Sequence, residues 1–193
     1  MEGAIDARLR RLAREVESRP DKTPGSDFVA ALSALARAGA DFVVVGVGGI
    51  NFYAQDPSEA VATLDLDVLL RPDPAVLRAA VAALHGLSFT FAAGGEPFVD
   101  LADDEALAAV VRRRATLTAR DAHGTQIDLM LTITGARYAE LEADAVAFRL
   151  GDVTVRVGRL ERLLRAKEAA GRAKDREFLR AFRARLEKDR TQR

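Results

Sequence analysis

Three aspartates in segments expected to be strands are the residues best suited to carry chemistry. Asp65 and Asp67 lie two residues apart in A-T-L-D-L-D-V-L-L, and Asp128 lies in T-Q-I-D-L-M-L-T. Residues two apart in a strand face the same side, so both carboxylates of the first segment leave one face. Two unit charges about 5 Å apart repel by roughly 3 kcal/mol at an effective dielectric constant near 20. A divalent cation would offset this repulsion, and Mg²⁺ characteristically takes one or two carboxylates together with substrate phosphates.

A purely structural interpretation of the acidic pair is also open, because charged residues on an edge strand discourage pairing with another chain. The third aspartate favours chemistry. Ile127, Leu129 and Leu131 form one apolar face of their strand, which leaves Asp128 on the opposite face, where aspartate is intrinsically unfavourable. Three aspartates on two strands could bracket a two-metal site for in-line phosphoryl chemistry.

A glycine-rich junction precedes the acidic strand. The segment F-V-V-V-G-V-G-G-I-N-F-Y-A predicts a buried strand over 42–45 and a short helix over 50–54 that opens on the glycines. Small residues at such a junction let backbone amides approach a phosphate, although Gly48 and Gly49 also suit close packing. The segment is neither a P-loop nor a dinucleotide fingerprint, because no Gly-Lys-Ser/Thr follows and the G-x-G-x-x-G spacing is absent.

Helices and strands alternate along the rest of the chain. Apolar spacing and capping signals predict helices over 4–18, 26–39, 74–85, 136–143, 159–170 and 174–188. Apolar runs and alternation predict strands over 62–70 and 88–91 and hairpins over 115–132 and 146–157, with a loop over 92–104 and an ambiguous segment over 106–111. We therefore expect an α+β (mixed α/β) fold, with a mixed sheet, flanking helices and a C-terminal helical arm.

Charge is unevenly distributed, although 29 basic and 29 acidic residues give no net charge over the 193 residues. Residues 159–193 hold 13 basic and 6 acidic residues, so the remaining 158 are net acidic. We expect a core over 1–158 that includes N-terminal helices, and a basic helical extension over 159–193 packed on it. The extension is either a solvated helix pair or a surface that meets phosphates.

Composition excludes several kinds of site. The chain has no cysteine and two histidines, which rules out disulfides, thiolate zinc sites and cysteine nucleophiles. Any metal is therefore expected to be a hard cation held by carboxylates. The apolar runs are much shorter than the roughly 18 residues of a membrane span, and the charged N-terminus lacks an apolar signal region. We expect a cytoplasmic protein with no membrane partner.

Together these motifs resemble the DNA polymerase β-like nucleotidyltransferase superfamily. The shared pattern is a strand, Gly-Gly opening a helix, Asp-x-Asp on the next strand and a lone Asp on a later strand, over about residues 28–133. The tail R-L-E-R-L-L-R-A-K-E-A-A-G-R-A-K-D-R-E-F-L-R-A-F looks like the C-terminal helices of small bacterial nucleotidyltransferases related to toxins of abortive-infection toxin–antitoxin systems. By this resemblance Gly48 and Gly49 hold the nucleoside triphosphate, Asp65 and Asp67 bind Mg²⁺, Asp128 assists the attacking hydroxyl and shares a metal, and Lys167 contacts phosphate.

The resemblance implies Mg²⁺-dependent transfer of a nucleoside monophosphate from an NTP to an acceptor hydroxyl. The acceptor is an RNA 3′ end such as that of tRNA, a protein or a small molecule, and the basic extension favours RNA. Two alternatives stay open: a non-catalytic nucleotide-binding or regulatory module of the same fold, and a nucleic-acid binder that uses only its C-terminal helices.

Two ionisable residues near the C-terminus have structural interpretations. Asp175 is expected to cap the last helix or to pair with Arg172 or Arg176. Lys174 is expected to be solvated, because Gly171 can break the helix between it and Lys167.

Overall fold

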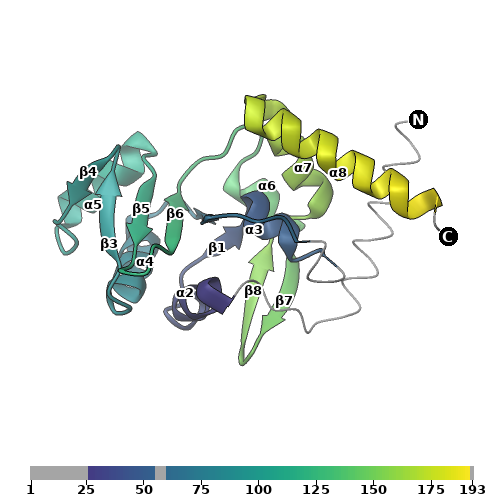
Figure 1. The fold of residues 1–193 in the computed structure, drawn as a ribbon. Helices are drawn as coiled ribbons and strands as arrows, with labels where there is room; N and C mark the ends of the chain where they lie inside the picture. Colours follow the sequence, from purple (N-terminus) through teal and green to yellow (C-terminus); the bar gives the residue numbers. More distant parts are fainter. Residues whose placement is uncertain (1–25, 55–59, 192–193) are drawn as a thin grey trace.

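The computed structural model of the protein describes residues 26–54 and 60–191 (Figure 1). Within them the chain forms seven helices and an eight-stranded mixed sheet, which confirms the predicted α+β fold. The helix predicted over 4–18 lies outside the described residues. In the part of the chain that is described, no helix is both long and apolar enough to cross a membrane.

The sheet is built around two parallel strands that carry the aspartates. Its order is β4-β3-β5-β6-β2-β1-β8-β7, in which β2·β6 and β1·β8 are parallel pairs and the other neighbours are antiparallel. The strands are β1 Phe42–Val44, β2 Asp65–Leu70, β3 Thr90–Ala93, β4 Glu96–Phe98, β5 Leu117–Arg120, β6 Gln126–Met130, β7 Val146–Leu150 and β8 Val153–Val157. Both predicted hairpins, β5–β6 and β7–β8, are confirmed.

The helices connect these strands and pack against them. They are α2 Ser26–Arg37, α3 Gly46–Asn51, α4 Pro74–His85, α5 Asp104–Arg113, α6 Tyr138–Ala143, α7 Leu160–Ala170 and α8 Ala173–Thr191. Helix α4 begins at the predicted proline, and the Asp73 side chain caps it by accepting a hydrogen bond from the Ala75 amide at 2.8 Å. Helix α4 contacts both α2 and α5, and α3 contacts α7.

Alternation along β2 and β6 separates the core from the acidic residues. Leu66, Val68, Ile127 and Leu129 are fully buried, whereas the aspartates between them are only partly buried. The predicted faces of both strands are therefore confirmed.

The C-terminal helices lie against the core. Leu160, Leu163 and Leu164 of α7 are buried, and α7 contacts α3 on one side and α8 on the other. Figure 1 shows α8 running across α7 and onward to the C-terminus. Gly171 ends α7 in the left-handed conformation with φ +61°, so the two helices are separate, as predicted.

Some local predictions differ from the structure, and one segment that the sequence left open is now assigned. Helix α3 begins at Gly46 rather than at residue 50. The predicted loop over 92–104 contains β4, which pairs with β3 around Gly94 and Gly95, both at positive φ. The ambiguous segment over 106–111 is part of α5, which begins where Asp103 accepts hydrogen bonds from the amides of Glu105 and Ala106.

Candidate active site

The three predicted aspartates meet because β2 and β6 are adjacent parallel strands. Their register places Asp67 directly opposite Asp128, and Asp65 opposite Gln126. Directly opposed residues on neighbouring strands are about 5 Å apart, so these carboxylates share one face at close range. The sequence predicted the shared face of Asp65 and Asp67, and the fold adds Asp128 to it.

Asp67 is the electrostatic centre of this group. Burial, followed by the charges of Asp65 and Asp128, raises the pKa of Asp67 from its ordinary 3.8 to about 6. The positive charges of Lys167 and Lys174 act in the opposite direction and lower the pKa of Asp67. A carboxylate held in this way favours a cation or a proton beside it, which is a property of functional sites.

The outer two aspartates are held by neutral donors. The Thr63 hydroxyl donates to Asp65 Oδ1 at 2.8 Å, and Gln126 Nε2 donates to both oxygens of Asp128 at 3.1 and 3.2 Å. Arg120 in turn donates to Gln126 Oε1 from Nε and Nη2, at 3.0 and 2.8 Å. Among the described residues, no side-chain donor binds the Asp67 carboxylate, so Asp67 is the one left available to a ligand.

Gly46, which the sequence analysis did not single out, is the glycine that lies against the aspartates. A Cβ at this position would lie 1.9 Å from Asp67 Oδ2, and its φ of +64° is in the left-handed region. Any side chain here would displace the Asp67 carboxylate as well as strain the backbone. Its signal in the sequence is its place as the first glycine after the buried strand.

The two predicted nucleotide-binding glycines are close-packed in this structure. A Cβ on Gly48 would lie 2.6 Å from Leu66 Cδ1, and one on Gly49 would lie 3.0 Å from the Val44 carbonyl oxygen. The Gly49 amide already donates to the Val45 carbonyl at 2.8 Å, inside α3. Packing thus accounts for both glycines, and their role in holding a nucleotide stays a prediction.

A cavity of about 410 Å³ opens beside Asp67. Gly46 and Asp67 line one part of it, Thr132 and Thr134 after β6 line another, and Lys167 and Arg172 line the part formed by α7 and the following turn. This volume is within the range of small-ligand sites, and it places an acidic group and two basic groups in one space. Such a distribution suits a ligand that carries both phosphates and a metal cation.

The two basic residues of the cavity lining share one buried acid, Asp175. Lys167 Nζ lies 3.2 Å from Asp175 Oδ1, and Arg172 Nε lies 2.6 Å from Asp175 Oδ2. The predicted pairing of Asp175 with Arg172 is confirmed, whereas its contact with Lys167 was not foreseen. Lys167 also lies over the Phe178 ring, 4.8 Å from its centroid.

The donor chemistry fits Mg²⁺, since carboxylate oxygens are its preferred protein ligands. In the described residues, no three acidic or histidine side chains converge on a common ion as they stand. Asp67 together with either neighbour, Asp65 on its own strand or Asp128 at the same register of β6, could supply the one or two carboxylates that Mg²⁺ uses beside substrate phosphates. Asp65 and Asp128 each accept hydrogen bonds from a neutral donor, Thr63 and Gln126 respectively.

Comparisons with protein-family models, with curated proteins and with solved structures found no match to this chain.

Proposed function

We propose that this protein is a Mg²⁺-dependent nucleotidyltransferase that moves a nucleoside monophosphate from an NTP to an acceptor hydroxyl. The main support is the pair Asp67 and Asp128, which lie at one register of two parallel strands. Asp67 faces a cavity that Lys167 and Arg172 also line. The proposal places the chain in the DNA polymerase β-like superfamily, near the toxins of abortive-infection toxin–antitoxin systems.

The proposed reaction is an in-line displacement at the α-phosphorus. The acceptor oxygen bonds to that phosphorus, the bond to pyrophosphate breaks, and Asp128 orients the acceptor hydroxyl and takes its proton. Asp65 and Asp67 would hold the Mg²⁺, which when bound would neutralise charge on the α-phosphate and the leaving group. Lys167 adds a positive charge near the triphosphate tail, and Gly46 leaves room for the Asp67 carboxylate.

The acceptor is proposed to be an RNA 3′ end such as that of tRNA, a protein hydroxyl or a small molecule. The basic C-terminal helices support RNA, because clustered Arg and Lys side chains attract phosphates. A cytoplasmic location belongs to the same proposal.

One observation favours a second candidate, a non-catalytic nucleotide-binding or regulatory module. Gln126 occupies both oxygens of Asp128, the residue that would receive the acceptor proton. Titration calorimetry with ATP or CTP, with and without Mg²⁺, separates binding from catalysis. Metal-dependent binding without transfer would support the module.

Transfer of label from α-³²P-NTP tests the enzyme directly. The variant Asp65→Asn/Asp67→Asn keeps the size of both side chains and removes both charges, so it is expected to abolish transfer and to keep the fold. Asp152→Asn is a matched control, because Asp152 is exposed and pairs with Arg37 on the surface. Undiminished transfer by the double variant would contradict the proposal.

A further inference from the structure

A buried ionic triad lies where α7 turns into α8. Asp175 is 1% exposed and binds two cations, Lys167, which is 12% exposed, and Arg172, which is 60% exposed. Each oxygen of the carboxylate takes one cation, at 3.2 Å from Lys167 and 2.6 Å from Arg172. Both cations line the cavity that contains Asp67.

Asp175 is fixed as an anion at this position. Burial alone would raise the pKa of Asp175, but hydrogen bonds from Arg172 and Lys167 outweigh it and hold the pKa below its ordinary value. Taking a carboxylate out of water is unfavourable by several kcal/mol unless it is paired and hydrogen-bonded. Asp175 therefore holds one nitrogen of each cation, Lys167 Nζ and Arg172 Nε, at its two oxygens.

The helix break determines which way the two cations point. Gly171 has φ +61° and ends α7 directly before Arg172, so α8 turns back along α7. The turn brings Arg172 and Lys167 together on one carboxylate, although they come from opposite sides of the break. Phe178 covers a second side of the Lys167 ammonium group. Arg172 also interacts electrostatically with Asp67 and Asp65.

Both cations keep donors that Asp175 does not use. The Arg172 guanidinium donates to Asp175 through Nε, which leaves its two terminal nitrogens for a bidentate contact with a phosphate. The Lys167 ammonium has three donors, of which Asp175 takes one. Two cations at a fixed spacing match successive phosphates of a polyphosphate chain better than one flexible lysine does.

The phosphate contact of Lys167 belongs to the proposed function; we infer that Arg172 is a second cation for the phosphates of a nucleoside triphosphate, and that Asp175 is the positioning residue that holds both. The identity of the ligand rests on the proposed function. The site itself is defined by its polyphosphate chemistry and can be tested without any transfer reaction.

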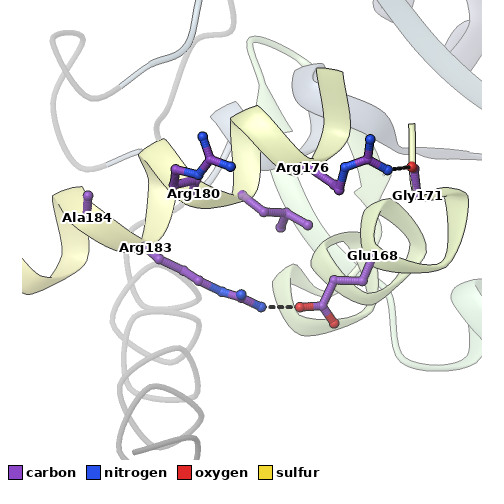
Figure 2. A pocket seen from close by; sticks show the side chains of 7 residues that line it. Glu168, Gly171, Arg176, Arg180, Arg183 and Ala184 are labelled. Carbon is purple, nitrogen blue, oxygen red and sulfur yellow. Dashed lines mark hydrogen bonds and ion pairs between the residues drawn. The ribbon is translucent and has the colours of Figure 1, made fainter. Parts of the chain in front are cut away.

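A second arginine-rich cavity supplies an internal comparison. It measures about 540 Å³ and lies between α7 and α8, with Arg176, Arg180 and Arg183 in its lining (Figure 2). Arg183 pairs with the exposed Glu168, and Arg176 donates to the Gly171 carbonyl oxygen. Its described lining includes no buried carboxylate that would order these arginines, so Arg180→Met removes the same charge from α8 without disturbing the triad.

Binding of inorganic tripolyphosphate to the full chain without Mg²⁺, measured by titration calorimetry, tests the inference. Lys167→Met, Arg172→Met and Asp175→Asn are each expected to weaken binding about tenfold or more, as loss of a charge-assisted hydrogen bond does. Arg180→Met is expected to bind within about twofold of wild type, because screened surface charges contribute little. Because Asp175 acts through Arg172, the double variant Asp175→Asn/Arg172→Met is expected to lose less than the product of the two single losses.

Several results would overturn the inference. The wild type could fail to bind tripolyphosphate at millimolar concentration, or a folded Asp175→Asn variant could bind it with wild-type affinity. The third such result is a double variant, Asp175→Asn/Arg172→Met, whose loss of affinity equals the product of the two single losses. Thermal melting identifies an Asp175→Asn variant that does not fold, and in that case wild-type affinity in Arg172→Met is the overturning result. If the variants lose tripolyphosphate binding as expected but the wild type transfers no nucleotide, only the proposed function is contradicted. If the wild type transfers nucleotide but none of the variants loses tripolyphosphate binding, only the inference is overturned.

Discussion

Replacing Asp67 with asparagine is expected to stabilise the metal-free protein at neutral pH, although it removes a central residue of the proposed site. Burial and the charges of Asp65 and Asp128 raise the pKa of Asp67 from 3.8 to about 6. The folded protein therefore binds the Asp67 proton more tightly than the unfolded chain does. The stability that this proton contributes is complete below about pH 4 and is lost as the pH rises to about 6.

The size of the effect follows from the pKa shift. Each pKa unit corresponds to about 1.4 kcal/mol, so ionising Asp67 lowers the free energy of unfolding by at most about 3 kcal/mol above pH 6. Asparagine has nearly the same shape and no charge to ionise. At pH 7.5 we expect Asp67→Asn to unfold with a free energy about 1–3 kcal/mol higher than the wild type.

Urea denaturation followed by circular dichroism, in EDTA and from pH 4 to 8, measures this difference. The advantage of Asp67→Asn is expected to appear between pH 4 and 6 and then to stay constant. Asp152→Asn is the control: the Arg37 side chain lowers the pKa of Asp152, so its replacement is not expected to stabilise the protein. An Asp67→Asn variant that is less stable than wild type at pH 7.5, or a difference independent of pH, would refute the reasoning.

Three further perturbations test the contact of Gly46 with Asp67, the packing of α7 and the place of the metal. Gly46→Ala is expected to lose transfer activity and stability. Gly39 has a similar φ (+67°) but open space around it, so Gly39→Ala incurs only the left-handed strain of about 1–2 kcal/mol. Equal stabilities of the two variants in urea would contradict the contact of Gly46 with Asp67. Leu163→Ala in the α3–α7 contact is expected to lower the free energy of unfolding by about 2–4 kcal/mol. Leu64 is 90% exposed, so Leu64→Ala is expected to change it little. A small effect at Leu163 would mean that α7 is not packed on the core. Mg²⁺ at 100 times its dissociation constant is expected to stabilise the wild type by about 2.7 kcal/mol and Asp67→Asn far less. Thermal melting measures the difference. Equal stabilisation of the two proteins would place the metal elsewhere.

Local pattern predicted those parts of the fold that short-range physics determines. The β7–β8 hairpin matches its prediction because apolar residues alternate on both sides of a Gly-Asp turn. The strand β4 was missed because it has three residues and contains Pro97, which is tolerated there because β4 is an edge strand. The early start of α3 was missed because glycine opposes helix formation, and packing against Leu66 and Val44 compensates for this.

The candidate site was predictable in its residue types but not in its assembly. The shared face of Asp65 and Asp67 follows from the period of a strand, but the opposition of Asp67 and Asp128 depends on a parallel register between segments 61 residues apart. The contact of Asp175 with Lys167 depends on the direction that α8 takes after Gly171. Both are tertiary facts that no local pattern encodes.

Comparing the fate of two labels in the presence of Mg²⁺ tests whether the protein transfers a nucleoside monophosphate. NTP labelled with ³²P at the α- or γ-phosphate is incubated with the full chain and a mixture of RNA, protein and small-molecule acceptors. We expect the α label to enter an acceptor, the γ label to leave only as pyrophosphate, and Asp67→Asn to abolish both. Transfer of the γ label, no transfer of either label, or unchanged transfer by Asp67→Asn would contradict this expectation.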